Sequence, residues 1–165
     1  MQLIISGSAG IGKTTFAKRI AAHTKAIYLP DYIDLILKER GLHSPRELDN
    51  ITAISVRHEA LDRKIAQEKN ESHFVADKGV IDYLAYWLIW TAPHASQSDN
   101  QQFYDKATKH ARLSLQQHIV LKFGKYGLVD NTVRLTNYFH QFHVHTLTKG
   151  IYQELRIPFI DYDYS

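Results

Sequence analysis

The chain has 165 residues, 44% of them hydrophobic and 22% charged, and a formal net charge of +3. These values predict one globular domain that buries a sizeable core, and the absence of cysteine excludes disulfides and thiolate metal sites. The modest positive charge favours anionic ligands without pointing to nucleic acid, which we therefore do not expect as a partner. The N-terminus carries no signal-peptide pattern, and the apolar stretch at 83–92 is too short for a bilayer, so we expect a cytoplasmic protein that does not enter membranes.

Short apolar segments alternate with helical patterns along the whole chain. The predicted strands cover 2–6, 26–30, 73–77, 118–123 and 158–163. The predicted helices cover 13–23, 31–40, 45–70, 81–90, 98–117 and 133–155. In the helix at 45–70, we expect Ile51, Ile54, Leu61 and Ile65 to form the buried face. This alternation predicts an α/β fold, with a five-stranded parallel sheet between two layers of helices in a single domain over 1–165.

Open parallel sheets bind ligands at the carboxyl ends of their strands. The residues at those ends are therefore the candidates for a site. They are the loop after the first strand, Asp31, Asp77-Lys78, the glycine-containing segment around 124–134, and the tail after the fifth strand.

The loop after the first strand has the strongest functional signal in the chain. Residues 7–14 match G-x-x-x-x-G-K-[ST] in full, with a predicted strand before them and a helix after. Glycines permit positive φ, so successive N–H groups can line a concavity at the helix N-terminus, where the dipole favours an anion. The alternative is a glycine-rich turn with an exposed lysine. The full match favours nucleotide binding by the following residues: Gly7, Ser8, Ala9, Gly10, Ile11, Gly12, Lys13, Thr14 and Thr15.

Within this motif the side chains have separate expected tasks. Lys13 would reach the β- and γ-phosphates of ATP, the Thr14 hydroxyl would bind Mg²⁺, and Thr15 would contact a phosphate oxygen. Asp77, at the end of the third strand, would hold the same Mg²⁺ directly or through water, although a helix N-cap is its simpler alternative. Lys78 would place a cation beside the phosphates.

The third strand end reads Asp77-Lys78-Gly79, followed by Asp82 and Tyr86. Together with the phosphate loop, it resembles the P-loop small-molecule kinases, in the group of AAA-type ATPases and kinases that includes nicotinamide riboside kinase-like, deoxynucleoside kinase-like and nucleoside monophosphate kinase-like proteins. The group typically has arginine where this chain has Lys78, which loses bidentate phosphate contact. We expect Asp82 to be a helix cap and Tyr86 to pack.

The resemblance implies further site residues. An acid after the second strand, here Asp31, would act as base or bind the acceptor hydroxyl, with an N-cap as the alternative. A lid at about 124–134, containing Asp130 and Arg134, would close over the phosphates with help from Lys125. Lys13, Asp31, Asp77 and Arg134 would then be the catalytic residues. Arg57 on the middle helix is expected to be a solvated charge, or alternatively a contact for an anionic acceptor.

These residues predict ATP-dependent phosphoryl transfer to a small-molecule acceptor, a nucleoside or nucleotide. The alternative is a stand-alone P-loop NTPase or a nucleotide-gated regulatory module, which would use the same loop with water as the acceptor. Phosphorylation of nucleic-acid ends ranks third, because the basic residues are spread along the chain. His140, His143 and His145 lack metal-ligand spacing and are expected to be packed or surface imidazoles. The sequence indicates neither the acceptor nor the oligomeric state.

Overall fold

The computed structural model of the chain describes residues 1–124 and 137–163. It contains a five-stranded sheet in the order β2-β3-β1-β4-β5, in which every neighbouring pair is parallel. The strands are β1 (Gln2–Ser6), β2 (Ile27–Leu29), β3 (Phe74–Asp77), β4 (Gln117–Leu121) and β5 (Ile160–Tyr162). The first strand is thus the central one, and its carboxyl end lies between those of β3 and β4. The sheet confirms the predicted α/β class.

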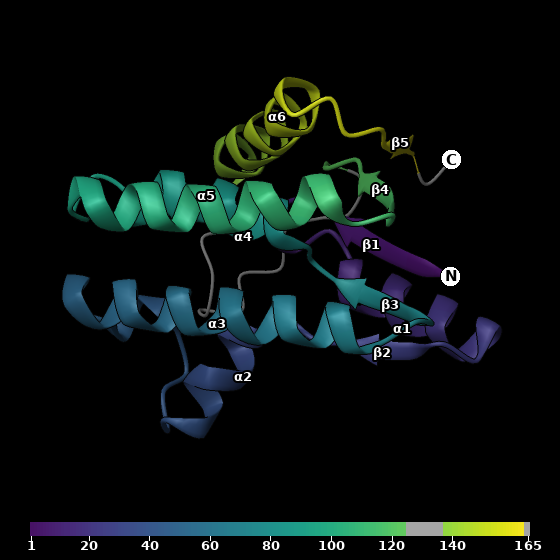
Figure 1. Cartoon of the computed structure of the whole chain (residues 1–165), viewed down its shortest axis with the longest axis horizontal. Coiled ribbons are helices and arrows are strands. Elements are labelled where there is room, and N and C mark those ends of the chain that lie inside the picture. Colours follow the sequence, from purple (N-terminus) through teal and green to yellow (C-terminus); the bar gives the residue numbers. More distant parts are fainter. Residues whose placement is uncertain (125–136, 164–165) are drawn as a thin grey trace.

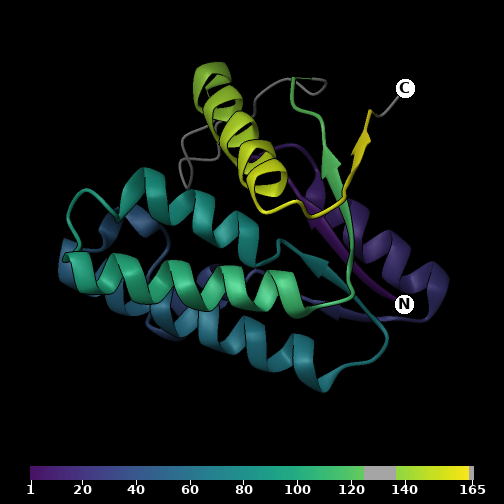
Figure 2. The same cartoon turned by 45° about the horizontal axis from the view of Figure 1, so that its top comes forward.

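Helices cover both faces of this sheet (Figures 1 and 2). They are α1 (Lys13–Thr24), α2 (Tyr32–Glu39), α3 (Asn50–Asn70), α4 (Val80–Trp90), α5 (Gln97–Leu113) and α6 (Tyr138–Glu154). Figure 2 shows α1 on one side of the sheet and α3, α4 and α5 on the other. The molecule is therefore the three-layer structure that the alternation of apolar strands and helices predicts.

Alternation along β1 sends successive side chains into two different cores. Leu3 and Ile5 pack with Ala17 and Ala21 of α1 on one face of the sheet. Ile4 points to the other face, where it meets Leu29 of β2 and the side chains of β3. The largest cluster lies among the helices, where Trp87 of α4 stacks on Phe103 of α5 with ring centroids 4.1 Å apart. Because both faces of β1 are buried, the loop that follows it starts from a rigid base.

The segment at 45–70 corrects the sequence prediction. Instead of one helix there is a 3₁₀ turn, Pro45–Glu47, closed by a capping box between Ser44 and Glu47, and α3 then begins with Asp49 as its N-cap. The predicted helical face is wrong at Ile51, whose side chain is 82% exposed. The buried side chains of α3 include Lys64 and Glu68. A pattern based on apolar residues alone could not find this face, because two of its members are charged.

Other boundaries differ by a few residues. Helix α5 ends at Leu113, before the predicted end at 117, because Ser114 adopts an extended backbone and β4 already begins at Gln117. Helix α6 begins after Asn137, whose side chain accepts a hydrogen bond from the His140 N–H. The predicted lid, with Lys125, Asp130 and Arg134, lies outside the described residues.

Candidate active site

The phosphate loop follows β1 and has the backbone that its glycines permit. Gly7, Gly10 and Gly12 all have positive φ, at 137°, 75° and 87°. At Gly7 a Cβ would also lie 2.7 Å from the Ile11 side chain and 3.0 Å from the Leu121 carbonyl oxygen. A side chain at position 7 is therefore excluded by space as well as by φ.

The loop leads into an uncapped helix N-terminus. Gly12 is the N-cap of α1 and supplies no side-chain hydrogen bond, and the first turn of α1 has no acidic residue. Unpaired N–H groups at such a helix start attract anions. The Ser8 hydroxyl is also buried in the loop without a hydrogen-bond partner. These features fit the phosphates of a nucleotide.

Lys13 is the first residue of α1, and its side chain turns back over the loop. Its Nζ donates a hydrogen bond to the Ser8 carbonyl oxygen, and only 4% of the residue is exposed. The contact holds the ammonium group at the mouth of the concavity. This is the side from which a lysine can reach phosphates that the loop N–H groups bind.

Thr14 and Asp77 come together from different elements. The Thr14 hydroxyl donates to the Asp77 carboxylate at 2.5 Å, and the Tyr28 hydroxyl donates to the same carboxylate oxygen at 3.3 Å. Burial and the neighbouring Asp77 charge raise the pKa of Tyr28, so Tyr28 stays a neutral donor. A hydroxyl and a carboxylate beside a phosphate site are oxygen ligands that suit Mg²⁺, which commonly takes one or two carboxylates plus substrate phosphates.

Asp82 supports the loop from α4. It is fully buried, and its carboxylate accepts hydrogen bonds from the Ser6 hydroxyl at 2.6 Å and from the N–H groups of Gly7 and Gly79, each at 2.9 Å. Burial raises the pKa of Asp82, and these three hydrogen bonds oppose that shift. The contact with Gly79 confirms the predicted capping role, because Asp82 is the third residue of α4. The sequence does not predict the contacts of Asp82 with Ser6 and Gly7, which lie more than 70 residues away.

Helix α6 holds the same loop from another direction. The Tyr152 hydroxyl lies 2.8 Å from Ser6 Oγ and 3.0 Å from His118 Nδ1. In the first turn of α6, the Gln141 side-chain amide donates to the Ala9 carbonyl oxygen at 2.9 Å. Sequence reasoning found neither Tyr152 nor Gln141, because they lie more than 130 residues from the loop and belong to no motif.

Asp31 and Lys78 form a second cluster beside the loop. Asp31 is the N-cap of α2, and one of its carboxylate oxygens accepts from the Ile33 N–H and the Tyr83 hydroxyl, both at 3.1 Å. The other oxygen pairs with Lys78 Nζ at 2.5 Å. Asp31 is thus a cap and a pocket residue at once. The two sequence alternatives for this residue do not exclude each other.

Lys78 takes an unusual backbone conformation to reach Asp31. Its φ is 65°, in the left-handed region that non-glycine residues seldom adopt, and the next residue packs closely on β1. Its Nζ also lies 4.8 Å from the centroid of the Tyr86 ring, a cation–π distance. The sequence predicts this ammonium beside the phosphates, and the structure brings it to the Asp31 carboxylate.

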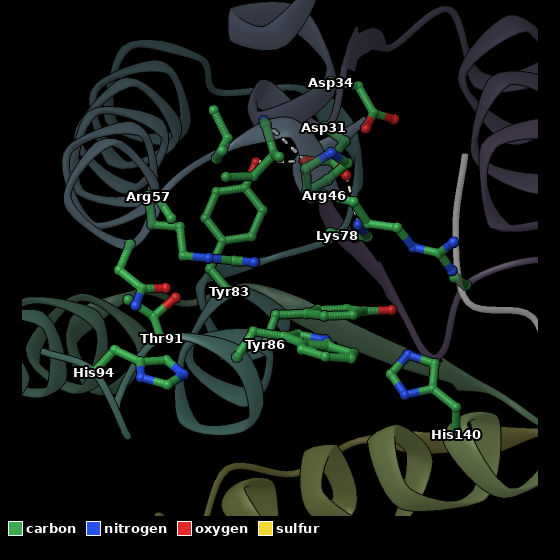
Figure 3. Close-up of a pocket in the computed structure, with 17 residues that line it drawn as sticks. Asp31, Asp34, Arg46, Arg57, Lys78, Tyr83, Tyr86, Thr91, His94 and His140 are labelled. Atoms are coloured by element: carbon green, nitrogen blue, oxygen red, sulfur yellow. Dashed lines mark hydrogen bonds and ion pairs between the residues drawn. The ribbon is translucent and has the colours of Figure 1, made fainter. Parts of the chain in front are cut away.

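A pocket of about 500 Å³ opens beside both clusters (Figure 3). Ala9 of the phosphate loop, Asp31 and Lys78 line one part of it. Tyr83 and Tyr86 of α4 and Arg57 of α3 line another, and Figure 3 shows the Arg57 guanidinium extending into the cavity between the two tyrosines. The remaining lining residues come chiefly from α2, the 3₁₀ turn and the ends of α3 and α4. The pocket is of a size that holds a small organic molecule.

A buried lysine fixes the strand ends that border this pocket. Lys64 of α3 is fully buried, and its Nζ donates to the carbonyl oxygens of Pro30 and Asp77, both at 3.2 Å. It therefore joins the ends of β2 and β3, the two strands that place Asp31 and Asp77. Burial lowers the pKa of Lys64. A lysine in a helical pattern normally indicates a position that faces solvent, so no sequence signal pointed to this role.

A family model described as an AAA domain matches residues 2–164. The chain belongs to this AAA domain family. No curated protein matches the sequence. The match confirms the resemblance to AAA-type proteins that was drawn from the phosphate loop and the third strand end. Solved structures of similar fold include kinases.

Three solved structures show what this AAA domain chain resembles in fold. The NadR protein in complex with NR superposes with a TM-score of 0.71 at 15% identity, over 96% of this chain and 42% of that one. Thymidylate kinase from Candida albicans gives 0.65 at 16% identity, over 99% and 84% of the two chains. Deoxyadenosine kinase from M. mycoides gives 0.62 at 14%, over 100% and 90%. The chain thus spans about two fifths of the NadR chain and most of either kinase.

Two further findings bear on the predicted partners and cofactors. Among residues 1–124 and 137–163, no helix is long and apolar enough to cross a membrane. Within the same residues no group of three or more histidine, cysteine or acidic side chains is arranged to hold a metal ion. The Thr14–Asp77 pair is a smaller arrangement, of the kind that binds a metal together with nucleotide phosphates.

Proposed function

We propose that this chain transfers a phosphoryl group from ATP to a small-molecule acceptor, a nucleoside or a nucleotide. The observation that carries the proposal is the buried Asp31–Lys78 pair, which lies on the wall of a 500 Å³ pocket that the phosphate loop also lines at Ala9. A protein that only hydrolyses or senses a nucleotide needs no such second pocket. The kinase neighbours support the same class of reaction at the level of the fold.

In this proposal the phosphate loop binds the triphosphate. The loop N–H groups and the helix α1 N-terminus face the phosphates, and Lys13 moves from the Ser8 carbonyl to a phosphate oxygen. Thr14 and Asp77 hold Mg²⁺, which neutralises charge on the phosphates when it is bound. Lys78, Thr15 and the predicted lid residue Arg134 are proposed as further contacts. Such a site acts through position and charge rather than covalent chemistry.

Asp31 is the proposed base for the acceptor hydroxyl. Its carboxylate is oriented by Tyr83, Ile33 and Lys78, so that it can accept a hydrogen bond or proton from a hydroxyl bound in the pocket. Tyr86 and Trp90 line the same pocket with aromatic surface, on which a base can stack. The pocket therefore offers both a reactive end and a surface for a planar ring.

A phosphate-transfer screen tests the proposal. Purified chain, ATP and Mg²⁺ would be incubated with nucleosides, nucleoside monophosphates and nicotinamide riboside, and phosphorylated products measured by chromatography. The expected result is product from one class of acceptor, abolished in Lys13→Ala and retained in Lys109→Ala, an exposed lysine on α5. ATP hydrolysis that is indifferent to the whole panel would favour the stand-alone NTPase instead.

A further inference from the structure

The part of the pocket formed by Arg57 and Thr91, here called the distal subsite, contains buried polar atoms without partners. Arg57 Nε and Thr91 Oγ1 are both inaccessible to solvent and make no hydrogen bond in the structure. Among the described residues no carboxylate forms an ion pair with Arg57, and Thr91 is 2% exposed. Both residues line the pocket. Arg57 is half-buried there, and its guanidinium extends into the cavity.

The distal subsite lies away from the proposed reactive end. Thr91 follows the last residue of α4, whose first turn contacts the phosphate loop through Asp82, and eleven residues of helix span about 16 Å. Arg57 lies two turns before Lys64 on α3, about 10 Å along the helix axis from it. Figure 3 shows Arg57, Thr91 and His94 on the opposite side of the pocket from His140.

The cationic side chains on the two sides of the pocket differ in whether a carboxylate pairs with them. At the reactive end, Lys78 is neutralised by Asp31. At the distal subsite, Arg57 forms no ion pair within the described residues. Burial lowers its pKa, and the nearby Asp31 and Tyr86 oppose that shift. A buried donor without a partner, such as Arg57 Nε, is costly unless a ligand supplies the missing acceptor.

We propose that the acceptor carries an anionic group, a carboxylate or a phosphate, which binds Arg57 and Thr91 in the distal subsite. A guanidinium has five N–H donors and no acceptor, so its partner must bring oxygen lone pairs. Carboxylates and phosphates match its planar fork with two parallel hydrogen bonds. The buried Thr91 hydroxyl can donate a third once its side chain turns toward the cavity. This inference rests on the proposed function, since it names the class of acceptor that the same pocket takes.

Binding measurements without ATP test the inference independently of phosphate transfer. Isothermal titration calorimetry would compare two matched pairs on the full chain: nicotinic acid riboside with nicotinamide riboside, and thymidine 3′-monophosphate with thymidine. The member of one pair that bears the carboxylate or phosphate, here called its anionic member, is expected to bind about 10-fold more tightly than the member without that group, and that pair tells carboxylate from phosphate.

Variants assign the preference to the subsite. In Arg57→Met the two members of that pair should bind with equal affinity, whereas Arg57→Lys should keep part of the preference. Thr91→Val should reduce it about threefold. Arg63→Ala, an arginine on the same helix whose ion pairs are with Glu39 and Glu59, should keep it in full. The melting temperature of Arg57→Met should equal or exceed that of the natural chain, because a half-buried charge without an ion pair is removed.

The outcomes separate the two proposals. Equal affinity within both pairs, or no binding of either anionic member, overturns the anionic subsite whether or not the chain is a kinase. So does a preference that Arg57→Met leaves intact. A preference that depends on Arg57, in a chain that phosphorylates nothing in the screen, supports the subsite and overturns the proposed reaction.

Discussion

The two ends of the pocket differ in how far their polar groups satisfy one another. At the phosphate loop, most side chains already have partners: Lys13 bonds Ser8, Thr14 bonds Asp77, and Asp82 holds Ser6 and Gly7. At the distal subsite, Arg57 and Thr91 contain buried polar atoms with none. A site preorganised by its own bonds suits the invariant part of the proposed substrate pair, the triphosphate of ATP. A site with unmet donors depends on its ligand and so selects it.

The sharpest test at the phosphate end is Lys13→Ala. Removing the ammonium should lower the rate of phosphate transfer about 10³-fold, because a cation aimed at the developing phosphate charge contributes on that scale. Loss of the hydrogen bond from Lys13 Nζ to the Ser8 carbonyl oxygen should also lower stability, by about 1 kcal/mol. Transfer kinetics and thermal unfolding measure the two effects. Activity that survives in the variant would remove the loop from the proposed active site.

Asp31→Asn tests the boundary between the two ends. The amide keeps the N-cap hydrogen bond to the Ile33 N–H but cannot act as a base, so the rate should fall about 10²-fold while the KM for ATP stays within about twofold. Asp49→Asn is the matched control, because Asp49 caps α3 in the same way and does not line the pocket. Steady-state kinetics compare them. If Asp31→Asn transfers phosphate as fast as Asp49→Asn, Asp31 acts only as the N-cap of α2 and not as a base.

Lowering the pH weakens the support of the loop through His118. Burial lowers the pKa of His118 to about 4, against 6.5 for an ordinary histidine. Between these values the unfolded chain binds the proton and the folded chain does not, so this group makes stability fall as the pH falls. By pH 5 its contribution is on the order of 2 kcal/mol. Urea unfolding at pH 7 and pH 5 should show a smaller loss in His118→Asn than in the natural chain; identical losses would contradict the assignment.

The smallest expected effect is that of Tyr152→Phe. With Asp82 ionised, the hydrogen bonds run in one direction, from His118 to Tyr152, then Ser6, then Asp82. The variant interrupts this chain, and leaving the buried His118 donor unpaired should cost about 1–2 kcal/mol in the free energy of unfolding. Tyr104→Phe, on an exposed site of α5, should cost less than half of that. Chemical denaturation of both variants gives the comparison.

The sequence predicts the phosphate-loop end of the pocket better than it predicts the distal subsite. The parallel sheet, the phosphate loop and the strand-end residues Asp31 and Asp77 were predictable, because strand periodicity and the glycine-lysine motif are local signals. The buried face of α3 was not, because Lys64 and Glu68 occupy positions that a hydropathy pattern assigns to solvent. The position of Arg57 on the pocket wall was not predictable for the same reason. A charged residue enters a core where partners from other elements compensate it, and single-sequence patterns do not contain those partners.

The residues that hold the phosphate loop in place are synthesised after the loop itself. During synthesis the motif at residues 7–14 emerges well before Asp82, Gln141 and Tyr152. A ribosome-bound chain that ends near residue 100 would contain the motif and Asp82 but neither tether from α6. It would also lack β4, which pairs with the far edge of β1. The nascent protein therefore acquires a recognisable nucleotide motif long before it acquires a rigid nucleotide site.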